Sequence, residues 1–170
     1  MKSIQFKPFL IERIIEGKKT ETRRLVKNKT KPRYKVGETV YIKEKLYRNV
    51  DNGISFEDGE PIPDTNWGWK RNVLSPMFMP AKYARLFLRI IGIKTERLHD
   101  ITEADAIAEG IFLTDYGWSW KESPKEYEFF ITPRIAFANL WESIHGDNES
   151  TCWCSGPEVF VYKFEVIEKP

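Results

Sequence analysis

The sequence predicts an α+β fold: a small curled mixed sheet with appended short helices and two long ordered loops, in a single domain over residues 1–170. Three observations support this class. The predicted helices and strands do not alternate as βαβ units, so a parallel α/β sheet is not expected. The last strand is apolar on both faces, as interior strands and barrel staves are. A chain of 170 residues is also long enough for one well-buried core but short for two full-sized domains.

A short helix is predicted from Pro8 to a C-capping Gly17. Proline fits the first helical position, apolar residues recur between the two at helical spacing, and glycine suits the left-handed end of a helix. The following segment, residues 18–35, holds nine basic side chains and a single acid, Glu21. Such a density suits a polyanion such as a nucleic-acid backbone, although a solvated basic loop accounts for it equally well.

The first predicted strand follows a turn at Gly37 and carries Glu44 on its apolar face. An isolated buried carboxylate costs several kcal/mol or more, so Glu44 must be paired with a cation or hydrogen-bonded. Lys19 and Arg24 are the nearest candidates by charge. We therefore expect one of these two side chains to lie beside Glu44.

Two long segments without sustained periodicity, residues 48–80 and 112–131, are the predicted ordered loops. Four of the six tryptophans lie in them, Trp67 and Trp69 in the first and Trp118 and Trp120 in the second. Ordered loops often carry binding residues, and flat indole rings can stack on bases. Trp67 and Trp69 are therefore candidate ligand contacts.

The remaining predicted elements are, in order, a strand over 85–93, a helix from Thr102 to Ala108 with Gly110 as its stop, a helix starting at Thr132-Pro133, and a strand over 158–167. Glu109 is thus the last residue of the second helix. There the negative end of the helix macrodipole disfavours an ionised carboxylate. Glu109 either contacts something cationic or is merely tolerated at this position.

The composition gives no reason to expect a disulfide, a metal or a membrane span. Cys152 and Cys154 are one residue apart, too close for an ordinary disulfide framework, so reduced thiols are expected. With His99 and His145 as the only histidines, neither a metal site nor another cofactor is predicted. No segment approaches the roughly 20 apolar residues that span a bilayer, so we expect a cytoplasmic protein without a membrane partner.

Most enzyme classes find no support in the sequence. It contains no Gly-rich phosphate loop, no Ser/His/Asp set with a plausible histidine and no paired-histidine metal motif. What remains is the segment GKKTETRR over residues 17–24, together with the carboxylates of Glu44 and Glu109.

Several segments together resemble the ASCH superfamily. They are GKKTETRR (17–24), the turn and strand over 36–44, SPMFMP with the following stretch to Arg85 (75–85), ITEADAIAEG (101–110) and the closing strand after Trp153. The longer form with two Trp-bearing segments resembles members found in phages and prophages. The resemblance covers most of the chain. It implies a PUA-like β-barrel, a fold related to RNA-binding domains of RNA-modifying enzymes.

Some small ASCH proteins are amidohydrolases that remove the acetyl group of N(4)-acetylcytidine. The resemblance implies Thr22 as the nucleophile, Lys19 as its base and Glu109 as the group that orients the lysine or shuttles the proton. A threonine hydroxyl needs such a base, and a lysine can serve only if its pKa is lowered. Arg24 would hold a phosphate or a carbonyl oxygen. Further expected substrate or phosphate contacts are Lys18, Arg23, Glu44, Trp67 and Trp69.

The leading hypothesis is therefore a metal-independent amidohydrolase acting on an acylated nucleoside or nucleotide. Strict strand alternation places Lys19 and Thr22 on opposite faces, so this site needs a bend directly after Gly17. The alternative is a non-catalytic reader of RNA or of a modified base, in which the basic segment contacts phosphates. A ribonuclease ranks third because no well-placed histidine pair is present. The expected partner is a nucleoside, nucleotide or RNA, and the chain is taken as a monomer.

Overall fold

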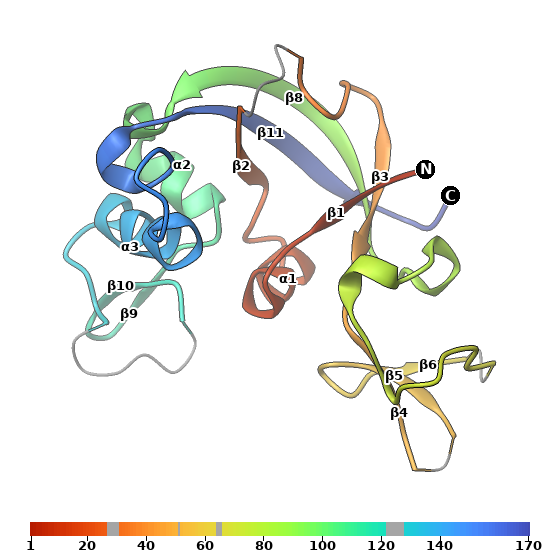
Figure 1. Cartoon of the computed structure of the whole chain (residues 1–170). Helices are drawn as coiled ribbons and strands as arrows, with labels where there is room; N and C mark the ends of the chain where they lie inside the picture. The colour runs from red at the N-terminus through yellow and green to blue at the C-terminus, as the bar shows by residue number, and fades with distance from the viewer. Residues whose placement is uncertain (27–30, 51, 64–65, 122–127) are drawn as a thin grey trace.

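A five-stranded mixed sheet dominates the computed structural model, which describes residues 1–26, 31–50, 52–63, 66–121 and 128–170. Its two longest strands form an arch across the molecule (Figure 1). The strands lie in the order β1 (Lys2–Gln5), β3 (Thr39–Lys43), β8 (Phe87–Arg97), β11 (Glu158–Ile167) and β2 (Glu21–Leu25). Only β1 and β3 pair in parallel among these neighbours. The predicted α+β class is confirmed.

The sheet is curled but open, so the implied barrel is not closed in this chain. Strands β1 and β2 are its two edges and do not pair with each other. A side chain spans the opening instead: Nη2 of Arg24 on β2 donates to the carbonyl oxygen of Gln5 on β1, at 2.6 Å. A register shift between Lys163 and Phe164 interrupts the pairing of β11 with β8, and such bulges bend a sheet.

Helix α1 (Pro8–Ile15) lies under the arch (Figure 1). Ile11 and Ile14 on this helix belong to the core cluster formed with the sheet. Gly17 follows with φ +70°, the left-handed conformation expected of a C-terminal cap. The amide N–H groups of Lys18 and Lys19 then both donate to the carbonyl of Arg13, at 2.8 and 2.9 Å. The chain therefore turns sharply after Gly17, as the predicted site required.

Two further helices and a hairpin gather at one end of the arch (Figure 1). They are α2 (Glu103–Ala108), α3 (Pro133–His145), β9 (Phe112–Thr114) and β10 (Gly117–Ser119). Thr102 caps α2 in a capping box with Asp105, as the sequence predicts. The second predicted loop thus contains a β-hairpin; its residues 122–127 lie outside the described residues.

The first predicted loop contains a separate small sheet at the other end of the molecule (Figure 1). Its strands lie in the order β6 (Pro61–Ile62), β5 (Ile54–Phe56), β4 (Leu46–Arg48) and β7 (Val73–Leu74). Strands of two or three residues are too short to show a readable alternation, so only an irregular segment was predicted here. Single turns of 3₁₀ helix complete the described elements: η1 (Pro76–Phe78), η2 (Ala81–Tyr83), η3 (Leu98–Asp100) and η4 (Trp153–Ser155).

The prediction of reduced thiols is wrong, because the structure joins Cys152 and Cys154 in a disulfide. The turn of η4 brings their Cα atoms to 5.4 Å, within the range that disulfides bridge. Sequence separation alone did not reveal this local turn. Within the described ranges, no helix is long and apolar enough to cross a membrane. No group of three or more His, Cys, Asp or Glu side chains in the same ranges is placed to hold a metal ion.

Candidate functional site

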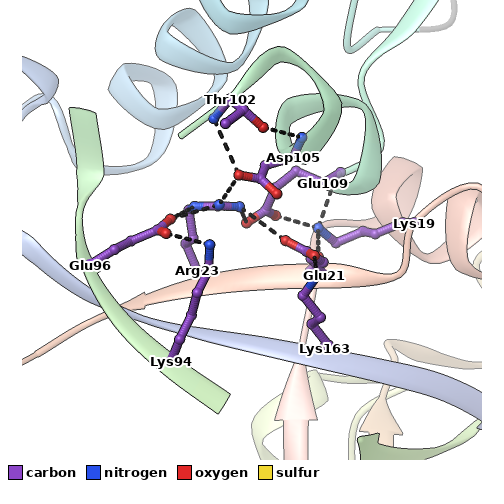
Figure 2. A network of polar contacts seen from close by, with 9 residues as sticks. All are labelled: Lys19, Glu21, Arg23, Lys94, Glu96, Thr102, Asp105, Glu109 and Lys163. Atoms are coloured by element: carbon purple, nitrogen blue, oxygen red, sulfur yellow. Dashed lines mark hydrogen bonds and ion pairs between the residues drawn. The ribbon is translucent and has the colours of Figure 1, made fainter. Parts of the chain in front are cut away.

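Lys19 lies at one side of a largely buried polar network (Figure 2). Its side chain has no exposed surface, and its ammonium group donates three hydrogen bonds. The acceptors are the carbonyl of Glu21 at 2.7 Å, the carbonyl of Glu109 at 2.7 Å and Oε2 of Glu109 at 2.6 Å. Burial lowers the pKa of Lys19 below its ordinary value, although the nearby Glu109 carboxylate opposes this effect.

Glu109 is the C-cap residue of α2, and its carboxylate contacts two cations. Oε2 accepts from Lys19, and Oε1 accepts from Nη1 of Arg23 at 3.2 Å. These charges offset the unfavourable position at the negative end of the helix. Of the two interpretations of Glu109 open from the sequence, contact with a cation is the one observed. The backbone is fixed as well, because the amide of Thr20 donates to the carbonyl of Ala108 at 2.9 Å.

Arg23 holds Glu109 from the side opposite Lys19 (Figure 2). Its guanidinium has no exposed surface and also contacts Glu96 at 2.7 Å and Asp105 at 3.4 Å. The network contains four cations and four acids: Lys19, Arg23, Lys94 and Lys163 with Glu21, Glu96, Asp105 and Glu109. The paired charges stabilise one another, and the contact with Arg23 holds the Glu109 carboxylate in place.

Thr22 and Arg24 project from the other face of β2. Their cross-strand partners on β11 are Tyr162 and Phe160, which belong to the core cluster under the arch. A cavity of about 340 Å³ opens beside them, and we name it the Thr22 cavity. Its wall includes Phe6, Thr22, Arg24 and Glu109, together with the apolar face of α3.

Lys19 does not line the Thr22 cavity; it is hydrogen-bonded to Glu109, which does. Its Nζ also lies 5.7 Å from the centre of the Phe6 ring, and the guanidinium of Arg24 lies 5.1 Å from the same ring. Of the three predicted catalytic residues, Thr22 and Glu109 line the Thr22 cavity, whereas Lys19 does not line it and is hydrogen-bonded to Glu109.

The partner predicted for Glu44 is wrong. Neither Lys19 nor Arg24 pairs with it; Nη2 and Nε of Arg85 contact its two oxygens at 2.7 and 3.1 Å. Arg85 lies just before β8 (Phe87–Arg97), the sheet neighbour of β3, so a cation 41 positions away in the sequence pairs with Glu44. Burial raises the pKa of Glu44, and Arg85 opposes this shift. Glu44 does not line the Thr22 cavity.

Three other predicted contacts also lie away from the Thr22 cavity. Lys18 is exposed and pairs with Glu16 at 3.0 Å. Trp67 and Trp69 pack against each other, with ring centres 4.9 Å apart, and against the core of the small sheet. Neither ring lines the Thr22 cavity, and the indole N–H of Trp67 donates to a backbone carbonyl within the small sheet's own loop.

The sequence did not identify Phe6 or the aromatic face of α3 as part of the cavity wall. Phe137 and Trp141 follow a helical apolar period, and such a period by itself indicates core positions. Both are buried, and both also line the Thr22 cavity. A periodic pattern identifies the buried face of a helix, but it does not show whether that face meets packed atoms or a cavity.

No protein-family model and no curated protein sequence matches this chain. Comparison with solved structures does find similar folds. The crystal structure of protein EF3133 from Enterococcus faecalis V583, assigned to family model DUF984, superposes with a TM-score of 0.50 at 14% identity, covering 99% of this chain and 81% of that one. The fold is ASCH-like. An ASCH domain from Lactobacillus crispatus JV V101 aligns with a TM-score of 0.46 at 14% identity, covering 93% and 70% of the two chains. At this identity the ASCH-like likeness concerns the fold alone.

Proposed function

We propose that this chain binds an acylated nucleoside in the Thr22 cavity and hydrolyses its amide, as in removal of the acetyl group of N(4)-acetylcytidine. One observation carries the proposal: Glu109 lines the same cavity as Thr22, and its carboxylate is hydrogen-bonded to a fully buried lysine ammonium. The volume of about 340 Å³ lies within the usual range for small-molecule sites.

The proposed reaction begins when Oγ of Thr22 attacks the acyl carbonyl carbon. The hydroxyl proton moves to Glu109 and on to the neutral form of Lys19, a form that burial makes more accessible. Arg24, in the same wall, stabilises the negative charge on the carbonyl oxygen. When the C–N bond breaks, the nucleoside amine leaves with the returned proton. Water then cleaves the ester on Thr22 and releases the carboxylic acid.

The test is the hydrolysis of N(4)-acetylcytidine, followed by its change in ultraviolet absorbance. We expect Thr22→Ala to lower kcat by about 100-fold or more, and Thr22→Ser to retain part of the activity, because serine keeps the hydroxyl. Thr20→Ala is the matched control, since Thr20 is exposed on the same segment and its bonds there are made by backbone atoms. Full turnover by Thr22→Ala would rule out this nucleophile.

A non-catalytic reader of RNA or of a modified base is the second candidate. All three protons of the Lys19 ammonium are already donated within the protein, as expected for a charge that only shapes a binding site. Wild-type protein that retains RNA in a salt-dependent manner but forms no product would favour this function. A ribonuclease gains no support from a histidine pair, because His145 lines the Thr22 cavity but His99 does not, and the ring of His99 contacts the Trp153 carbonyl.

A further inference from the structure

A second cavity, of about 550 Å³, opens between the two edges of the sheet. It is lined by both edge strands, including Ser3 and Gln5 on β1 and Arg24 on β2. We name it the Tyr34 cavity. Gln5 and Arg24 also line the Thr22 cavity, so the two cavities adjoin at the Arg24–Gln5 hydrogen bond that spans the open sheet.

Two buried tyrosines form one wall of the Tyr34 cavity. The rings of Tyr34 and Tyr162 meet edge to face with centres 5.1 Å apart. Their hydroxyls fix the neighbouring backbone: that of Tyr34 donates to the Ser3 carbonyl at 2.8 Å, and that of Tyr162 accepts from the Arg33 amide at 2.9 Å. Nζ of Lys2 holds the Arg33 carbonyl at 2.7 Å. The segment that carries Arg33 is therefore fixed at the opening of the sheet.

Positive charge is concentrated around these rings. Arg24, Lys31, Arg33 and Lys43 all line the Tyr34 cavity, and no acidic residue is among the described residues that line it. Lys31 and Arg33 are exposed to solvent, whereas Arg24 and Lys43 are half-buried. Cations beside aromatic rings in a groove are the combination that binds the phosphates and bases of single-stranded nucleic acids.

We propose that the Tyr34 cavity binds a phosphate ester attached to the nucleoside that occupies the Thr22 cavity. The substrate is then a nucleotide, free or within a polynucleotide, in preference to a free nucleoside. Arg24 lies at the junction of the two cavities, and Lys31 and Arg33 supply the exposed charges that meet the phosphate. This inference rests on the proposed function for the placement of the base, but its test does not depend on turnover.

The test measures equilibrium binding by calorimetry in the Thr22→Ala variant, so that no ligand is consumed. The ligands are N(4)-acetylcytidine, its 5′-monophosphate and a tetranucleotide that contains it. We expect at least one phosphorylated ligand to bind about tenfold or more tightly than the nucleoside, with an advantage that shrinks as salt is added. If the monophosphate already binds more tightly than the nucleoside, a free nucleotide is enough to occupy the phosphate site. If only the tetranucleotide binds more tightly, the ligand of this site is a polynucleotide.

The double variant Lys31→Gln/Arg33→Gln should abolish this advantage and leave nucleoside affinity within about twofold. Both side chains are exposed, and the bonds that fix the segment use the backbone of Arg33, so the variant is expected to fold. Arg89→Gln/Lys169→Gln removes the same charge from exposed positions that do not line the cavity and should keep the advantage.

Equal affinity for the nucleoside and both phosphorylated ligands would overturn the inference. An equal loss of affinity for all three ligands in Lys31→Gln/Arg33→Gln would overturn it as well. If the wild type fails to deacylate any of them yet retains the phosphate advantage, the proposed hydrolysis is refuted and the phosphate site is supported.

Discussion

Lys19 shows how burial and pairing act against each other on one side chain. Removal from water favours the neutral amine, and the Glu109 carboxylate favours the ammonium. The net effect is a lowered pKa, as a lysine base requires. Because Glu109 stands between Lys19 and the cavity, the proposed proton path passes through the carboxylate.

This balance predicts the pH profile of the proposed hydrolysis. The neutral amine is the base, and its fraction rises with pH, so kcat/KM should rise and level off above the pKa of Lys19, below the ordinary value of 10.5. Lys19→Arg should remove the activity because arginine stays protonated. Initial rates measured between pH 6 and about 10 would check this. A flat profile in the wild type would show that Lys19 is not the base.

The turn between α1 and β2 determines where Lys19 points. Gly17 lets the helix end in the left-handed region, and the next two amides close on the Arg13 carbonyl. Strict alternation along an extended strand would have separated Lys19 from Thr22. The turn instead places Lys19 beside the end of α2 before β2 begins at Glu21.

Gly17→Ala should therefore affect catalysis more than stability. A Cβ at position 17 meets no atom within 4 Å, but the φ of +70° costs about 1 kcal/mol for alanine. Gly37→Ala is the matched control, with a φ of +83° and equally open space. We expect similar losses in the free energy of unfolding, measured in urea, but a drop in turnover only for Gly17→Ala. Equal turnover in both variants would contradict the role of this turn.

Arg85 joins the main sheet to the small sheet. From its position just before β8, it contacts Glu44 after β3, Asp58 at 2.7 Å, and Glu60. A single cation thus holds three carboxylates from segments on either side of β4 and β5. Arg85 therefore links the start of β8 to the segments that enter and leave the small sheet.

Arg85→Met should destabilise the protein by about 3–5 kcal/mol at neutral pH, because it leaves Glu44 buried without its cation. The pKa of Glu44 is already raised, so the native state holds its proton more tightly than the unfolded chain does, and ionisation of Glu44 lowers stability as the pH rises. The cost of Arg85→Met should therefore shrink as the pH falls through that pKa. Urea unfolding at several pH values would test this. Arg89→Met, at an exposed pair, should cost less than about 1 kcal/mol.

The molecule concentrates its positive charge on the open side of the arch. Residues 1–50 carry 15 Lys and Arg against 5 Glu, and this part of the chain supplies the four cations of the Tyr34 cavity. Residues 27–30 of the basic segment lie outside the described residues. The net charge of +2 conceals this asymmetry, which favours an anionic ligand at the opening.

Binding of single-stranded RNA should accordingly weaken with salt. Three to four phosphate contacts give a slope of about −2 to −3 in a plot of log affinity against log salt. Filter retention of a labelled oligonucleotide between about 50 and 200 mM salt would measure it. A slope near zero would exclude phosphate contacts as the source of affinity, and Lys31→Gln/Arg33→Gln should reduce the slope by about 1 to 2.

Local sequence patterns were sufficient to predict the main helices and the last strand. Capping residues and apolar spacing located α1, α2 and α3, and a run of apolar residues on both faces located β11 from Glu158 to Ile167. The small sheet was not predicted, because its strands are too short to show a recognisable alternation. The disulfide was not predicted, because it depends on the single 3₁₀ turn at Trp153.

The sequence by itself predicted an α+β class with an ASCH-like fold and pointed to Gly17–Arg24 and Glu109 as candidate site residues. The folded chain determined that Glu109 reaches Lys19 across 90 positions, that Glu44 pairs with Arg85 and that the sheet stays open at Arg24. Helical and strand periods depend on neighbours a few residues away, so they can be read directly from the sequence. Charge partners and cavities depend on which distant segments pack together, and that is decided only when the core forms.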